Sequence, residues 1–117
     1  MAAPNIVNVT TITGKTDVLN VITTTSDVVR NPASSGKVYK INYLTVANVD
    51  GSSSADVTLN MERDSAVYPI LYTVTVDNDA TLDALSKGIY LEEGDTLRLT
   101  SGTASALEAV ASYEVLA

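Results

Sequence analysis

The chain of 117 residues has the size of one domain and can bury a self-supporting core without disulfide bonds. Seven basic and fourteen acidic residues give a net charge of 7 − 14 = −7, which argues against nucleic acid as a partner because phosphate groups carry the same sign. Cysteine and histidine are absent, which excludes thiol nucleophiles, Ser–His pairs and the usual zinc and haem ligands, so we predict that the chain is not an enzyme and has no cofactor.

The N-terminal sequence M-A-A-P-N-I-V-N has neither a basic region nor a long apolar run. It is therefore not expected to act as a signal peptide. No window of the chain approaches the ~20 apolar residues that a membrane-spanning helix needs, so we expect no membrane partner.

Residues 1–36 are rich in the β-branched residues Val, Ile and Thr, which favour strands. Two such runs flank Gly14 and Lys15, a pair that suits a two-residue hairpin turn of type II′. The segment is expected to be either a hairpin within the subunit or an arm that pairs with a neighbouring subunit, because both arrangements satisfy unpaired strand edges. A third short run covers Ser26–Arg30, and residues 31–36 form a loop by composition.

Residues 37–117 are predicted to form the body of the domain. Apolar and polar residues alternate through Tyr39, Ile41 and Tyr43, which predicts a half-buried strand. The apolar phase then slips by one residue, so we predict a β-bulge near Tyr43 and Leu44.

Two more strands are expected on either side of a turn at residues 63–65. The first contains the cleanest alternation of the chain, at Val57, Leu59 and Met61. In the second strand Pro69 lacks an N–H group and so belongs on an edge or at the start. The second strand is predicted to place the following side chains on a single face: Tyr68, Ile70, Tyr72, Val74 and Val76.

Three segments complete the pattern. Residues 80–86 fit a short helix or a strand, and residues 105–116 also fit a helix in part, but the β-rich neighbours and the strict alternation favour strands for both. Between them, residues 89–101 are expected to form two strands joined by a turn in which Gly94 needs a positive φ. The best candidates for the interior are Ile89, Leu91, Leu97 and Leu99.

The pattern amounts to eight to ten short strands separated by polar turns. It predicts an all-β fold, an antiparallel β-sandwich or jelly roll with an N-terminal β-hairpin or arm. We divide the chain into an N-terminal strand or arm segment, residues 1–36, and a β-sandwich body, residues 37–117.

Carboxylates are the remaining candidates for chemistry. Glu92 and Glu93 are adjacent on a turn and point apart in extended backbone, which suits neither a glycosidase pair nor a metal clamp. Asp77, Asp79 and Asp83 resemble the start of a calcium loop, but the glycine at its sixth position and the glutamate at its twelfth are missing. A plain acidic loop is favoured, and we predict no catalytic, cofactor-binding or metal-binding residue.

The only aromatic residues are six tyrosines. Tyr39 and Tyr43, and likewise Tyr68 and Tyr72, are expected in the core or at the rim of the sandwich, because aromatic residues are enriched in strands and bury well. A carbohydrate platform is disfavoured since such platforms usually include Trp. A subunit interface is a third interpretation, because Tyr is enriched at interfaces.

Three segments carry a resemblance to a known family. They are V-A-N-V-D-G-S-S-S-A-D-V-T-L at residues 46–59, I-Y-L-E-E-G-D-T-L-R-L at residues 89–99 and L-E-A-V-A-S-Y-E at residues 107–114. In this order they resemble a family of small virion structural proteins of tailed bacteriophages, of the type found in phages of cyanobacteria and other marine hosts. Residues 1–36 carry little of the resemblance.

The resemblance implies a structural role in an assembled virion. The leading hypothesis is a capsid decoration or cement protein that binds the shell of major capsid protein, stabilises it and self-associates through residues 1–36. The protein would then be located in the virion, which is assembled in the host cytoplasm. The alternative is a neck, tail or fibre-attachment component. A third hypothesis, from another class, is a calcium- or carbohydrate-binding module.

Overall fold

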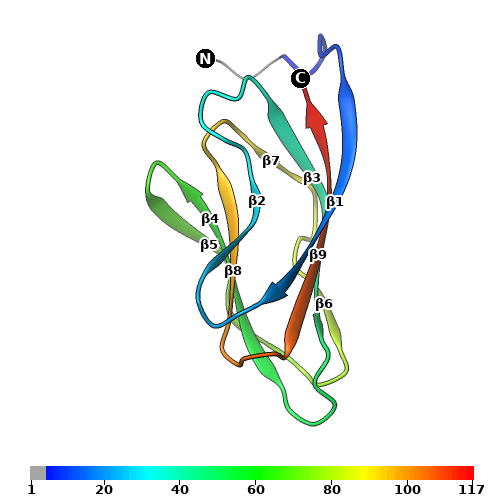
Figure 1. Ribbon diagram of the computed structural model, residues 1–117, viewed down its shortest axis with the longest axis vertical. Coiled ribbons are helices and arrows are strands. Elements are labelled where there is room, and N and C mark those ends of the chain that lie inside the picture. Colours follow the sequence, from blue (N-terminus) through cyan, green and yellow to red (C-terminus); the bar gives the residue numbers. More distant parts are fainter. Residues whose placement is uncertain (1–4) are drawn as a thin grey trace.

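The computed structural model describes residues 5–117, and its strands are β1 (Ile12–Val21), β2 (Ser26–Arg30), β3 (Val38–Asn48), β4 (Ala55–Arg63), β5 (Ala66–Val76), β6 (Thr81–Asp83), β7 (Ile89–Leu91), β8 (Thr96–Ser101) and β9 (Leu107–Leu116). They form two antiparallel sheets packed face to face (Figure 1). One sheet has the order β1-β9-β3-β6, with β7 also paired to β3, and the other has the order β2-β8-β4-β5. This architecture confirms the predicted β-sandwich. No helix of the length and apolarity needed to cross a membrane occurs in residues 5–117.

The core lies between the two sheets and is built from alternate residues of their strands. Leu59, Leu97 and Leu99 are fully buried there. Each such leucine stabilises the fold by about 2 kcal/mol relative to an exposed position. The predicted interior positions are confirmed for Leu91, Leu97 and Leu99, while Ile89 is half-buried and packs against the core.

The predicted β-bulge is present in β3. The pairing of β3 with β9 shifts register between Ile41 and Tyr43, close to the expected position. Ile41 and Leu44 are both buried, so the bulge keeps apolar side chains on the core side across the slip of phase. On its other side, β3 pairs with β7 before the bulge and with β6 after it, so the bulge also divides this edge of the sheet.

The predicted hairpin turn at Gly14 and Lys15 is wrong. β1 runs straight through both residues, and all ten of its residues pair with β9 in an unbroken register. This ladder satisfies backbone groups along the whole strand, which a turn in its middle would interrupt. β1 and β2 both pair within the subunit, but β1 pairs with β9 and β2 with β8 instead of with each other.

β5 is an outer strand, as Pro69 predicted, but the expectation of a single apolar face is wrong. Thr73 adopts a φ of 48°, and the pairing of β5 with β4 shifts register nearby. The N–H of Thr73 donates to Oγ1 of Thr58 at 3.1 Å. After this irregularity, Val74 and Val76 pack against the core. The side chains before it are exposed instead: Tyr68, Ile70 and Tyr72.

Two buried asparagines join the sheets at opposite ends of the sandwich. Asn31, which follows β2, donates from Nδ2 to the carbonyl oxygens of Leu91 and of the residue before β3, at 3.0 and 2.9 Å. Asn48, the last residue of β3, donates from Nδ2 to the carbonyl oxygens of Ser53 and Val76 at 3.0 and 2.9 Å. Each amide thus satisfies its N–H donors with two backbone carbonyl oxygens.

Candidate functional site

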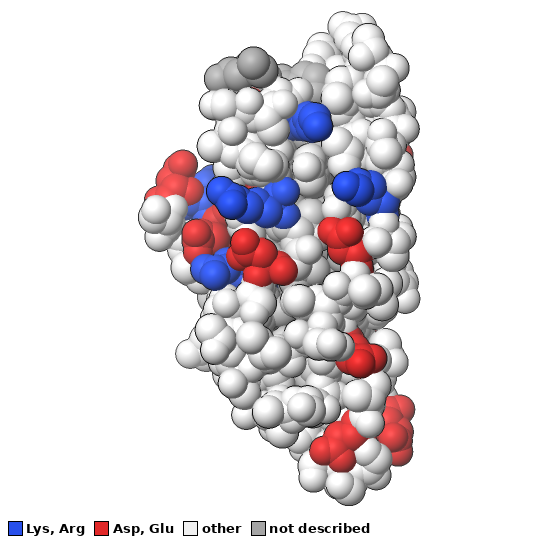
Figure 2. Space-filling model, in the orientation of Figure 1, with Lys and Arg blue, Asp and Glu red and all other residues white. Residues whose placement is uncertain are grey.

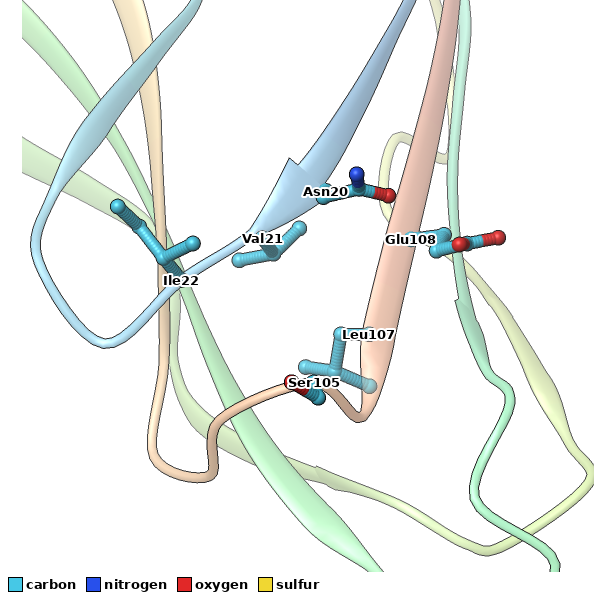
Figure 3. A pocket seen from close by; sticks show the side chains of 6 residues that line it. All are labelled: Asn20, Val21, Ile22, Ser105, Leu107 and Glu108. Atoms are coloured by element: carbon cyan, nitrogen blue, oxygen red, sulfur yellow. The ribbon is translucent and has the colours of Figure 1, made fainter.

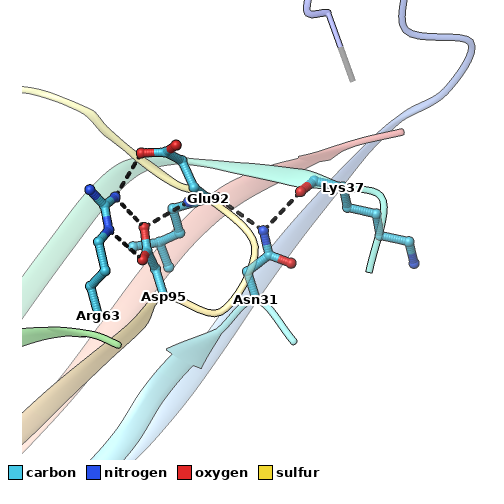
Figure 4. A network of polar contacts seen from close by, with 6 residues as sticks. Asn31, Lys37, Arg63, Glu92 and Asp95 are labelled. Carbon is cyan, nitrogen blue, oxygen red and sulfur yellow. Dashed lines mark hydrogen bonds and ion pairs between the residues drawn. The ribbon is translucent and has the colours of Figure 1, made fainter. Parts of the chain in front are cut away.

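A polar cluster surrounds the turn between β7 and β8 (Figure 4). Asp95 is 1% exposed, and its two carboxylate oxygens accept hydrogen bonds from Nε and Nη2 of Arg63 at 2.8 and 2.6 Å. Nη2 of Arg63 also lies 2.7 Å from Oε2 of Glu92. The backbone N–H of Glu92 donates to Oδ2 of Asp95 at 2.9 Å. Gly94 closes the turn with a φ of 89°, which confirms the predicted positive φ.

We call this cluster of Arg63, Glu92 and Asp95 the clamp, because it joins the end of β4 to the turn between β7 and β8. The hydrogen bond to Asp95 and, after it, the charges of Asp95 and Glu92 raise the pKa of the Arg63 guanidinium, which therefore stays charged. Asp95 is buried and hydrogen-bonded through both oxygens, so its carboxylate is not accessible to a substrate. Glu93 contacts a different group, the backbone N–H of Gly36 at 2.9 Å, so the two adjacent glutamates point to separate partners as predicted.

A hollow lies where β1 ends and β9 begins (Figure 3). Glu108 is the only titratable residue in its lining, and Figure 3 shows its side chain directed away from Val21. Ser105 supplies a hydroxyl, but the Glu108 side chain is directed away from it (Figure 3), so the two do not form a nucleophile with its base. The hollow is lined by Asn20, Val21, Ile22, Ser105, Leu107 and Glu108.

The aspartates of the predicted acidic loop do not form a metal site. Within residues 5–117, no group of three or more carboxylates is arranged to hold a metal ion. Asp77 and Asp79 belong to the turn after β5, and Asp83 ends β6.

Asp50 is held by hydrogen bonds within the β3–β4 loop. Its Oδ1 accepts hydrogen bonds from the N–H and the Oγ of Ser52 at 2.9 and 3.0 Å. These bonds, the backbone one first, lower the pKa of Asp50.

The tyrosines divide into a stacked pair, of which Tyr113 is buried and Tyr39 partly buried, and an exposed group. Tyr39 and Tyr113 stack with their ring centroids 5.5 Å apart, and the Tyr113 hydroxyl donates to Oδ2 of Asp17 at 2.7 Å. Burial and then this hydrogen bond raise the pKa of Tyr113 above its ordinary value. The prediction of a core or rim position is confirmed for Tyr39, which is partly buried and packs against the core, whereas its three companions are exposed and lie outside the core. The exposed tyrosines are Tyr43, Tyr68, Tyr72 and Tyr90.

β5 presents a run of exposed apolar side chains, which we call the β5 surface: Val67, Tyr68, Ile70 and Tyr72. Residues 65–76 contain no charged residue, although β5 is an outer strand of its sheet. Outer strands usually carry charges, above all Lys, that discourage pairing with other chains. An uncharged, exposed and apolar outer strand is typical of a surface that contacts another molecule.

A groove runs between β5 and the segment that links β6 to β7. Ile70 and Leu71 line one side, and residues 83–89 line the other. Gly88 allows the close approach of this segment to β3, because a Cβ at this position would lie 2.9 Å from the carbonyl oxygen of Ile41. The groove follows the open side of the sandwich, between the outer strands of the two sheets.

Charge is distributed unevenly along the long axis of the 49 × 26 × 20 Å body. On the face shown in Figure 2, Lys and Arg side chains lie in the upper half together with acidic groups, while the lower end carries acidic groups alone. Two of the arginines are engaged by neighbours, since Arg63 contacts Glu92 and Asp95, and Arg98 contacts Asp27 and Glu62. The lower end of this face therefore favours contact with basic surfaces.

Sequence patterns locate the turn of the clamp but not its cation. Gly94 and Asp95 follow from local turn chemistry, whereas Arg63 lies 32 residues earlier in the chain, and no local signal links the two segments. The alternation rule also misses the β5 surface, because it directs Tyr68 and its neighbours inward. The signal that identifies this surface is the absence of charge from residues 65–76.

No family model matches the chain, and no curated protein matches it in sequence. The comparisons thus give no support to the resemblance with phage virion proteins. Among solved structures, the fold is similar to that of a protein of Bacillus endospore appendages, which are described as a novel family of disulfide-linked pili. The similarity covers 91% of this chain and 87% of that chain, with a TM-score of 0.51 and 17% sequence identity. At this identity it shows a shared β-sandwich fold.

Proposed function

We propose that the chain is a non-enzymatic structural subunit that packs against other subunits in a larger assembly. The observation that carries this proposal is the β5 surface, an exposed apolar run on an uncharged outer strand. Such a surface gains free energy when a partner covers it. The polar cluster, the hollow and the acidic loop offer no arrangement of groups that supports a reaction.

Self-association is part of this proposal. The similar fold of the Bacillus appendage protein supports it, because that protein belongs to structures described as pili. The linkage must differ in one respect, since the 117 residues contain no cysteine and cannot contribute to a disulfide bond. Association through these residues therefore involves no disulfide bond.

For the identity of the assembly we propose a virion, with the chain as a capsid decoration protein that binds the major capsid protein. The resemblance of residues 46–59, 89–99 and 107–114 to small phage virion proteins supports this role. A neck, tail or fibre-attachment component is the alternative in the same particle. A subunit of a self-assembled fibre is the second candidate, and the shared fold with the appendage protein favours it.

Light scattering after size-exclusion chromatography and negative-stain electron microscopy of the purified chain test the proposal. A fibre subunit is expected to form filaments alone, whereas a decoration protein is expected to bind shells assembled from major capsid protein. The variant Tyr68→Ser, Ile70→Ser, Tyr72→Ser should lose either association. A matched control is Tyr90→Ser, which changes an exposed tyrosine on β7.

Two results would overturn the proposal. One is a wild-type chain that stays monomeric at high concentration and binds no shell. The other is association that the triple variant retains in full while circular dichroism shows it to be folded. The number of copies per particle in cryo-electron microscopy of purified virions separates decoration, with a copy number set by the shell lattice, from a neck or tail ring.

A further inference from the structure

The two longest uncharged stretches of the chain are residues 1–14 and 65–76. The second contains β5. Within the first, residues 5–11 form no strand, and Ile6 and Val7 are 50% and 84% exposed. Apart from two asparagines, residues 5–11 consist of Val, Ile and Thr, which are typical of strands. A strand-forming sequence therefore lies outside both sheets.

Residues 5–11 and the groove beside β5 lie on opposite sides of the sandwich. Residues 5–11 lead into β1, and the N–H groups of Thr10 and Thr11 both donate to the carbonyl oxygen of Ala117, at 2.9 and 3.1 Å. β1 contacts β2 and β8, whereas β5 contacts β4 and β3, and Figure 1 shows β1 and β5 at opposite sides of the body. A segment held beside β1 therefore does not reach the groove of its own subunit.

We propose that residues 5–11 of one copy of the chain lie along the groove between β5 and residues 83–89 of the next copy. This inference rests on the proposed function, because it requires that copies of the chain associate. The contact joins two different surfaces, so a row of copies has one unused segment at one end and one unused groove at the other. Contacts of this kind repeat from head to tail, and they form a filament unless the rotation between copies closes the row into a ring.

The groove and the segment are chemically matched. Residues 5–8 form a turn in the free chain, in which the N–H of Asn8 donates to the carbonyl oxygen of Asn5 at 2.9 Å, and the contact requires this turn to open. In the extended segment, Val7 and Val9 point to the same side, because successive side chains of a strand alternate. The apolar side chains of Ile70 and Leu71 border the groove, and Ile89 borders it from the other side. Burial of the two valines against these residues removes apolar surface of both copies from water. Residues 5–11 and β5 bring no charge to the contact, and the two charged residues that line the groove, Asp83 and Lys87, are exposed and lie on its other wall.

The backbone of β5 limits hydrogen bonding to the incoming segment, so the contact must depend mainly on side-chain packing. Pro69 has no N–H group, and the N–H of Thr73 already donates to Thr58. A regular ladder along the whole of β5 is therefore not available to the incoming segment. Seven residues held mainly by side chains bind weakly, so a covalent trap is the suitable probe of the contact.

The absence of cysteine from the 117 residues allows a disulfide trap without background. Val7→Cys is introduced into one preparation and Ser86→Cys, at the exposed wall of the groove, into another that carries a tag of different mass. After mixing and mild oxidation with copper phenanthroline, the mixed disulfide-linked dimer is expected in several-fold excess over the control pair. The control combines Ser86→Cys with Val49→Cys, since Val49 is 55% exposed and lies in the loop after β3.

Equal yields of mixed dimer from the two pairs would overturn the inference. A second measurement uses Val7→Asp with Val9→Asp, which should reduce the mass of the assemblies to that of the monomer, while Val49→Asp should not. If the wild-type chain assembles but the trap and the aspartate variant show no effect, the inference fails and the proposed function stands. If the wild-type chain neither self-associates nor binds shells, both fail.

Discussion

The outer strands β1 and β5 hold equivalent positions, each at the edge of one sheet, but they meet solvent in different ways. β1 pairs with β9 without a register shift and carries Lys15 and Asp17. β5 pairs with β4 across register shifts, contains Pro69 and the positive φ of Thr73, and lacks charge. Charged side chains thus discourage the pairing of other chains with β1, and an irregular backbone discourages their pairing with β5.

The two kinds of protection leave different surfaces exposed. Charged side chains keep other molecules away from the strand as a whole. An irregular backbone discourages only the addition of a regular strand, and it leaves apolar side chains free to pack. We therefore interpret β1 as a strand that stabilises the fold and β5 as a strand that presents a contact surface.

The largest effect should follow from removal of β1. Deletion of residues 1–21 removes the ladder with β9 and the buried side chain of Val21, so the shortened chain should show no cooperative unfolding transition by circular dichroism. The triple serine variant of the β5 surface is the matched contrast. It should keep its transition, because exposed substitutions change the free energy of unfolding by about 0.5 kcal/mol each or less. A shortened chain as stable as the wild type would contradict the division between the two strands.

A smaller effect should follow from Asp95→Asn, which tests whether the clamp holds the β4–β5 hairpin on the body. The substitution removes the charge that Arg63 contacts through two hydrogen bonds. We expect a loss of about 2 kcal/mol, less than for a fully buried pair because the Arg63 side chain is 40% exposed and can be hydrated. Urea unfolding measures the change. The control Glu92→Gln alters an exposed contact of the same guanidinium and should cost less than about 0.5 kcal/mol.

The smallest effect should follow from Tyr113→Phe, which loosens β1 without removing it. Loss of the hydrogen bond to Asp17 should lower the free energy of unfolding by about 1 kcal/mol. The folded state raises the pKa of Tyr113, so the folded chain binds more protons above the ordinary tyrosine pKa of ~10. The free energy of unfolding of the wild type should therefore fall as pH rises above ~10, and the variant should lose this part of the decline. Parallel alkaline curves for the two proteins would contradict the assignment.

Local rules account for much of the fold. β7, the turn at Gly94 and β8 follow from alternation and from the need for a positive φ, and β9 follows from strict alternation despite good helix-forming residues. The bulge of β3 is also predictable, because a slip in the apolar phase has few other solutions when one face is buried.

The errors arise where a distant partner decides the local structure. Gly14 and Lys15 have the chemistry of a turn, but β9 offers a complete ladder to the whole of β1, and this long-range pairing prevails. In β5 the alternation is regular in sequence, yet the faces reverse at Thr73, where φ is positive and the N–H donates to Oγ1 of Thr58. The clamp of Arg63 and Asp95 is hidden from the sequence for the same reason.

The unbroken pairing of β1 with β9 has a mechanical consequence. The first residue of β1, Ile12, lies opposite Leu116, so both ends of the described chain leave the body at the same place. A force that pulls these two ends apart would peel the strands and break their hydrogen bonds one pair after another. A force that enters at Ile12 and leaves through β5 instead acts along β1, perpendicular to its hydrogen bonds, and loads all ten pairs at once. A subunit that is pulled between Ile12 and β5 therefore withstands a tension that would separate β1 from β9 if it were applied to the two chain ends.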